Sequence, residues 1–211
     1  LPVAEQLGRE PDERLGVELP VVGDFDPDEI ARLAAELFGN WPSPVAFARI
    51  PQRYVPAVPL VRQIVTPDKA NATLRAGLTL PLQDTDPDYP ALVLANYLIG
   101  GTSGARLPRR IREQEGLSYS ISSFFGASSF EPRAEFGVGA IFAPQNRARV
   151  EALLKEELQR IISSGFTDPE VELGRQGLLQ ARQVARNQDG AIAGRLATLS
   201  YLGRDFLWAR D

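Results

Sequence analysis

The chain has 211 residues, 44% hydrophobic and 24% charged, which is enough to bury a core in one large domain or two small ones. It contains no cysteine, methionine or histidine, which excludes disulfide scaffolds, thiol nucleophiles, Ser-His-Asp triads and histidine-ligated zinc sites in this chain. Its formal net charge of -4 provides no electrostatic basis for binding nucleic acid.

The chain begins at Leu1 without an initiator methionine, and we expect it to be an internal piece of a longer protein. It carries no signal-peptide pattern and no apolar run long enough to span a bilayer. Residues 1–13 are polar and unpatterned, so we expect a poorly ordered lead-in there and one folded domain over 14–211.

The first expected elements are a buried strand over 15–25 and a helix directly after it. The helix begins at Asp26-Pro27-Asp28-Glu29, which combines an N-cap acid with a proline and further acids in the first turn. Gly39 is expected to end it. Five prolines follow within 41–59, so we expect an extended connection there without regular structure.

The middle of the chain begins with two strand patterns, over 60–65 and 72–80, separated by a turn at Thr66-Pro67-Asp68-Lys69. A largely buried helix is then expected from Asp86 to Leu98, because Asp86-Pro87-Asp88 precedes an apolar run. A glycine-rich stretch separates it from a short basic helix over 106–115, which Gly116 ends.

The last part of the chain begins with strand patterns over 117–127 and 133–141, which form a plausible antiparallel pair. An amphipathic helix is expected over 145–164. A capping box at Thr167-Asp168-Pro169-Glu170 then starts a helical region that extends to about Leu199 and is loosened at 187–190. Long helices beside hairpin-connected strands indicate an α+β fold with a mainly antiparallel sheet.

Two groups of residues resemble functional sites, but for each of them the sequence favours a structural role. The stretch Gly100-Gly101-Thr102-Ser103-Gly104 lies between two helices, which favours a helix break over a nucleotide-binding loop. A flexible loop that contacts peptides stays open as an alternative. The carboxylates Asp84, Asp86 and Asp88 lie at a helix start, which favours capping over a hard-metal site.

A more specific pattern places Arg112 near a helix end and Tyr119 on the following strand, seven positions later. The glycine between them would fold the two side chains back toward each other. A guanidinium beside a phenol hydroxyl can bind a peptide carbonyl or a carboxylate and can stabilise an oxyanion. On spacing alone, a solvated arginine and a half-buried strand tyrosine are the favoured interpretation.

A resemblance to a known family favours a functional interpretation of Arg112 and Tyr119. The chain resembles the C-terminal-type domain of the pitrilysin, insulin-degrading enzyme and mitochondrial processing peptidase family of zinc peptidases, and is most similar in look to long bacterial members. The resemblance covers about 15–201. It rests on these motifs in order: Val21-Val22-Gly23-Asp24-Phe25, Lys69-Ala70-Asn71-Ala72, Leu98-Ile99-Gly100-Gly101, Arg106-Leu107, Ile111-Arg112-Glu113, Glu115-Gly116-Leu117-Ser118-Tyr119-Ser120, Ala143-Pro144-Gln145-Asn146 and Gly165-Phe166-Thr167.

The resemblance implies a metallopeptidase fold of the LuxS and processing-peptidase type. It implies that zinc lies in a partner half with an inverted H-x-x-E-H motif, which this chain lacks because it has no histidine. It assigns Arg112 and Tyr119 to holding the substrate backbone and stabilising the oxyanion. It makes Gly100, Gly101 and Gly104 a candidate substrate loop, although Ser103-Gly104-Ala105-Arg106 departs from the usual Ser-Arg-Leu pattern.

The function implied is the substrate-binding, non-catalytic half of a zinc-dependent endopeptidase that acts on unfolded peptides. The chain alone would be inactive. The alternative within the same fold is an inert scaffold or assembly domain, and a third candidate is a self-contained enzyme with a hard metal at Asp84, Asp86 or Asp88. The resemblance to exported bacterial proteins favours the periplasm over the cytoplasm.

Overall fold

The computed structural model describes residues 19–209, apart from 41, 43–44 and 46–47. The expected lead-in over 1–13 therefore lies outside the described residues. The chain divides into two compact units, one of residues 1–50 with 182–211 and one of residues 51–181. The boundary after Ile50 falls within the proline-rich connection 41–59, whose described residues form no helix or strand.

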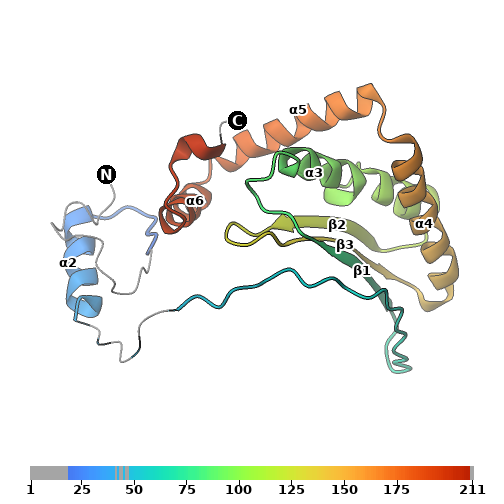
Figure 1. The fold of residues 1–211 in the computed structure, drawn as a ribbon, viewed down its shortest axis with the longest axis horizontal. Coiled ribbons are helices and arrows are strands. Elements are labelled where there is room, and N and C mark those ends of the chain that lie inside the picture. The colour runs from blue at the N-terminus through green and yellow to red at the C-terminus, as the bar shows by residue number, and fades with distance from the viewer. Residues whose placement is uncertain (1–18, 41, 43–44, 46–47, 210–211) are drawn as a thin grey trace. The chain divides into compact units, whose positions relative to one another are not determined.

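The unit of residues 51–181 contains an antiparallel sheet (Figure 1). Its strands are β1 (Ala72–Leu80), β2 (Ser120–Ala127) and β3 (Ala134–Phe142), in the order β1-β3-β2. The register pairs Ala76 of β1 and Ser123 of β2 with Val138 of β3. The α+β prediction is thus confirmed, and the three strands begin and end within a few residues of the expected positions.

The expected strand over 60–65 is wrong. These residues are extended but pair with no strand in the described part of the chain, and Leu60 and Val61 are 83% and 94% exposed. Apolar, β-branched residues provide the propensity for a strand, but a strand forms only where a ladder partner and a packing surface are present. The described structure supplies neither for this segment.

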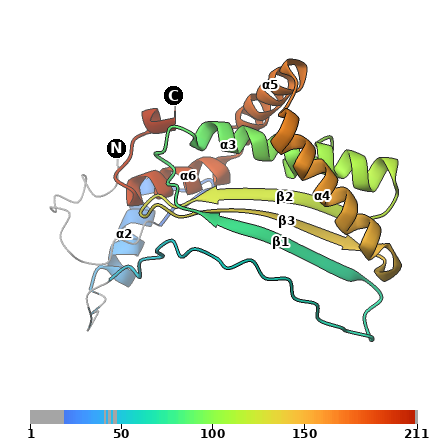
Figure 2. The ribbon, with the colours of Figure 1, turned by 45° about the vertical axis from the view of Figure 1, so that its right-hand side comes forward.

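Helices of the same unit cover one face of the sheet (Figures 1 and 2). The helix α3 (Tyr89–Asn96) continues into a π-helix, η1 (Tyr97–Gly101), and a second π-helix, η2 (Pro108–Gln114), follows. A 3-10 turn, η3 (Pro144–Asn146), leads into α4 (Arg147–Ser164), which Gly165 ends with a positive φ of 67°. α5 (Asp168–Ala185) comes next.

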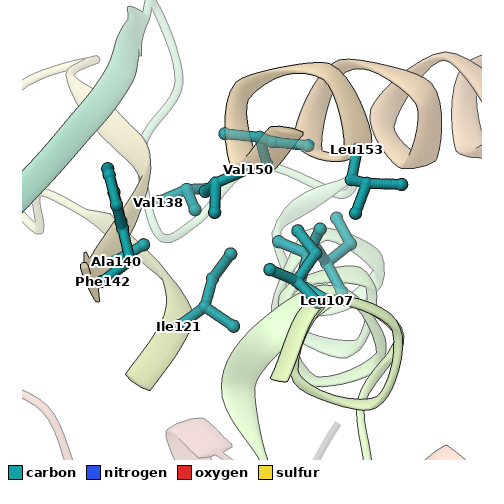
Figure 3. Close-up of a cluster of buried hydrophobic side chains, with 10 residues drawn as sticks. Leu107, Ile121, Val138, Ala140, Phe142, Val150 and Leu153 are labelled. Carbon is teal, nitrogen blue, oxygen red and sulfur yellow. The ribbon is translucent and has the colours of Figure 1, made fainter. Parts of the chain in front are cut away.

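The core of this unit lies between the helices and the sheet (Figure 3). Side chains from the two strands β2 and β3 point toward those from α4 and from the segment around η2. The most deeply buried of them are Leu107, Ile111, Val138, Phe142, Val150 and Leu153. Inward positions alternate along β2 and β3, as the period of two in a half-buried strand requires.

The predicted capping box at the start of α5 is confirmed. The backbone N–H of Thr167 donates to Glu170 at 2.9 Å, and the N–H of Glu170 donates to the Thr167 hydroxyl at 3.4 Å. The predicted loosening near residue 187 is also present, because α5 ends at Ala185 and α6 (Asp189–Tyr201) begins after a short turn.

The other unit contains α2 (Pro27–Phe38), α6 and a 3-10 turn, η4 (Phe206–Ala209). The Asp26 carboxylate accepts hydrogen bonds from the N–H groups of Asp28 and Glu29 and so caps α2 as predicted. The strand expected over 15–25 is absent from its described part, 19–25, which is exposed and unpaired. In the described residues no helix is both long and apolar enough to cross a membrane.

Candidate functional site

Arg112 lies on η2, one residue after the completely buried Ile111. The π-helical geometry is visible where the N–H of Glu115 donates to the Arg110 carbonyl, five residues earlier, at 3.2 Å. Buried Leu107 and Ile111 fix the inner side of this helix in the core, while Arg112 is exposed. The helix therefore presents the guanidinium of Arg112 outward from a rigid base.

A tight turn connects Arg112 to Tyr119. Gly116 takes a φ of 65°, which favours glycine, and the N–H of Leu117 donates to the Ile111 carbonyl at 3.0 Å. The Asn146 amide donates to the Leu117 carbonyl at 3.0 Å, and the N–H of Tyr119 donates to the carbonyl of Ile141 on β3 at 2.8 Å. The turn is thus fixed to η2, η3 and β3.

The two predicted site residues both present free side chains. Tyr119 is 62% exposed and Arg112 is exposed, and neither side chain has a hydrogen bond or ion pair with another residue in the part of the chain that the structure describes. A free guanidinium and a free phenol hydroxyl can donate hydrogen bonds to a peptide carbonyl or carboxylate. The turn places the two groups at its two ends.

Glu115 connects the end of η2 to α4. Its carboxylate lies 3.0 Å from Arg110 and 3.5 Å from Arg149, and its side chain is 25% exposed. Glu115 is therefore engaged with these two arginines. Arg109, also on η2, is exposed and without a partner within the described residues, which makes it a matched reference cation for Arg112.

The positioning roles of Glu115 and Asn146 were not predicted from the sequence. Asn146 stands in the motif Ala143-Pro144-Gln145-Asn146 that supports the family resemblance, but its contact with the Leu117 carbonyl depends on tertiary structure. No local pattern predicts that contact. The sequence gives only a weak indication that Glu115 forms ion pairs, since Glu115 follows several arginines.

The candidate glycine loop is helical only at its start, since Gly100 and Gly101 lie in η1 and residues 102–104 form a bend and a turn. Gly100 is buried in η1, and a Cβ placed on it would lie 2.6 Å from the backbone nitrogen of Ser123 on β2. Gly101 is exposed at the end of η1, and Gly104 is exposed with open space around it, since a Cβ added there would meet no atom within 4 Å. Of the three glycines, Gly101 and Gly104 are accessible to a peptide, and Gly100 allows close packing of helix on strand.

Arg106 lies just before η2 and holds the start of α5 beside the segment that leads into η2. Its Nε and Nη2 donate to the two carboxylate oxygens of Glu170 at 2.9 and 2.7 Å, and Nη2 also donates to the Gly165 carbonyl at 3.1 Å. The guanidinium lies over the Phe166 ring, 4.7 Å from its centre. The hydrogen bonds from Arg106 lower the pKa of Glu170 to about 2, and the same pair raises the pKa of Arg106.

The acidic cluster has structural partners. Asp84 is buried and accepts a hydrogen bond from the Ser129 hydroxyl, and the Asp86 carboxylate accepts one from the N–H of Asp88 at 2.9 Å. Among the described residues there is no group of three carboxylates or other ligands that could hold a metal ion. With no histidine in the sequence, the residues present do not fit zinc.

A comparison with protein families identifies the class of this domain. The model of the peptidase M16 inactive domain matches residues 16–178. The chain therefore belongs to the M16 peptidase family, as a domain of its inactive type, and the resemblance noted in the sequence is confirmed.

Individual relatives agree with this assignment. The chain is 34% identical over 117 residues to an uncharacterized zinc protease of Streptomyces coelicolor, a match that covers 54% of this chain and 25% of that protein. It is 28% identical over 137 residues to the non-peptidase homolog YmxG of Helicobacter pylori, covering 64% of this chain and 30% of that protein. The chain thus spans less than a third of the length of these curated relatives.

A solved structure supports the fold. The crystal structure of a peptidase M16 inactive domain from Pseudomonas fluorescens superposes with a TM-score of 0.64 at 21% identity. The superposition covers 90% of this chain and 44% of that one. At this identity the likeness shows a shared fold and carries no residue roles.

Proposed function

We propose that this chain is the substrate-binding, non-catalytic half of a zinc-dependent endopeptidase. The observation that carries the proposal is a rigid turn that presents Arg112 and Tyr119, both exposed and unpaired within the described residues, in a chain without histidine. A histidine-bearing half, covalently joined or separate, supplies the bond-breaking chemistry. The zinc-protease name of the Streptomyces relative supports this proposal.

The role of the two side chains follows from their chemistry. The Arg112 guanidinium donates hydrogen bonds to a carbonyl or carboxylate of an unfolded peptide, and the Tyr119 hydroxyl donates to the same stretch of backbone. As negative charge develops on the carbonyl oxygen during cleavage, donors held in place by a rigid turn stabilise it without reorganising. Arg112 and Tyr119 thereby orient the peptide and stabilise the oxyanion.

The second candidate is an inert scaffold or assembly domain of the same fold, which the name of the Helicobacter relative, a non-peptidase homolog, supports. Cleavage of a quenched fluorescent peptide library separates the two candidates. The library is offered to this chain, to the histidine-bearing half and to their mixture, each with and without a zinc chelator. Chelator-sensitive cleavage that requires the mixture supports the peptidase half, and a stable complex without cleavage supports the scaffold.

We also propose the periplasm as the compartment, on the family resemblance alone. Fractionation of cells that express the parent gene tests this directly. Recovery of the protein with periplasmic markers is the expected result, and recovery with cytoplasmic markers would contradict it.

A further inference from the structure

The sheet of residues 51–181 has a second face, opposite the helices, that we call the open face. It is formed by the odd-numbered residues of β1 and β3 and the even-numbered residues of β2, since side chains alternate along each strand. The helices α3 and α4 lie on the other face (Figures 1 and 2). The open face starts beside the candidate site, because Ser120, its first residue on β2, directly follows Tyr119.

One unpaired cation lies in the middle of the open face. Arg75 of β1 is exposed, and its guanidinium lies over Gly139 of β3, where a Cβ would come within 3.0 Å of the Arg75 Nη1. Arg75 has no hydrogen bond or ion pair with any described residue. Among the described residues of this face the one carboxylate is Glu135, and Arg133 already forms an ion pair with it. The face therefore offers a positive charge that no described residue neutralises.

The neighbours of Arg75 suit an extended peptide. Ser122, in the same row of the sheet, is exposed and its hydroxyl has no partner within the described residues. Phe124, in the next row, is 49% exposed, and its ring lies across Gly137, where a Cβ would collide with it. The surface thus combines a cation, a hydroxyl and an aromatic ring. Because Gly137 and Gly139 have no side chains, little else projects from the sheet between these groups.

The chain itself shows how extended backbone lies against one end of this face. The Thr79 hydroxyl donates to the carbonyl of Val55 at 3.3 Å, and Arg133 donates to the side chain of Gln52 at 2.6 Å. A shallow cavity of about 350 Å³ remains between Gln52 and Phe124. Extended backbone thus lies against this end of the open face, where one side chain of the face donates to a main-chain carbonyl.

We infer that the open face binds an extended peptide and that Arg75 selects peptides that carry a carboxylate side chain. The inference rests on the proposed function and adds a preference for acidic substrates. Arg75 and Ser120 are two residues apart along the register and two strand spacings apart across it, a separation of about 12 Å. In an extended peptide this corresponds to roughly three or four residues, so the acidic residue lies at that distance from the backbone held at Tyr119.

The test measures binding to the full chain and needs no catalytic half. Three labelled, unstructured peptides that differ at one position, Glu, Gln or Lys, are titrated and their fluorescence anisotropy is followed at low ionic strength. The Glu peptide should bind about fivefold more tightly than the Gln peptide, the upper range for an exposed ion pair, and added salt should remove the difference. Arg75→Ala should abolish the preference, and Arg75→Glu should transfer it to the Lys peptide.

The matched control is Lys155→Glu, which changes the net charge as Arg75→Glu does but lies on the exposed side of α4. It should keep the preference for the Glu peptide. Equal binding of the three peptides, no binding of any, or an unchanged preference in Arg75→Ala would overturn the inference. If the preference depends on Arg75 while the mixture with the histidine-bearing half cleaves nothing, the open face binds acidic peptides and the proposed peptidase function fails.

Discussion

Arg106 and Glu170 form a two-pronged, partly buried ion pair. Two hydrogen bonds between guanidinium and carboxylate join them, and the carboxyl end of α4 is held through Gly165 by the same guanidinium. The side chains are 18% and 36% exposed, so solvent screens the pair only in part. The contact fixes the start of α5 beside the segment that carries η2.

Replacing Glu170 by Gln should reduce the free energy of unfolding by about 1 kcal/mol at neutral pH, a value discounted for partial exposure. The folded-state pKa of Glu170 is about 2, below its ordinary value of 4.5. The contribution of the charged carboxylate is therefore complete above about pH 4.5 and is lost as the pH falls toward 2. Urea unfolding of both proteins across this range checks it, and a difference that stays constant with pH would contradict the assignment.

Site residues could be predicted only in part from the sequence. Spacing alone left Arg112 and Tyr119 as ordinary surface and strand residues, and the family resemblance raised them to candidates. Arg75 gave no signal, because its position on the open face depends on the register between β1 and β3. Asn146 likewise depends on a contact between segments far apart in the chain.

Helix boundaries were the most predictable feature at the scale of elements. The caps at Asp26 and Thr167 and the stop at Gly165 need only local hydrogen bonds or a local φ, so their signals lie within a few residues. The π-helical geometry of η1 and η2 was not predicted, because an apolar pattern does not distinguish it from an α-helix. The strand expected over 60–65 and the described part, 19–25, of the strand expected over 15–25 did not form, because a strand needs a non-local partner.

The contact between η1 and β2 leads to a prediction about Gly100. A methyl group at this position would lie 2.6 Å from the Ser123 nitrogen, so backbone must shift, and Gly100→Ala should destabilise the chain by about 1–3 kcal/mol. Gly104→Ala is the matched control, since nothing lies within 4 Å of its Cβ position. Thermal unfolding should show a lower Tm for the first variant only. Equal Tm values for the two variants would contradict the packing role of Gly100.

At the scale of the whole molecule, the chain is a domain of the inactive type in the M16 peptidase family. It matches the inactive-domain model over 16–178 and spans less than a third of the length of the Streptomyces and Helicobacter relatives. Without histidine it cannot supply the histidine ligands of an inverted H-x-x-E-H zinc site, and under the proposed function another segment or subunit supplies them. Under the proposed function, the chain contributes the turn that carries Arg112 and Tyr119 and the open sheet face, and these hold the peptide.

The most direct test of this account is the rate of peptide cleavage by the assembled pair, in which this chain carries either Arg112→Ala or Arg109→Ala. Both changes remove from η2 an exposed arginine that pairs with no described residue, so they match in charge and helix position. The account predicts that Arg112→Ala lowers kcat/KM about 100-fold, as expected for the loss of an oxyanion donor, and that Arg109→Ala leaves it near the parent value. Equal rates for the two variants would contradict the substrate-binding role of Arg112.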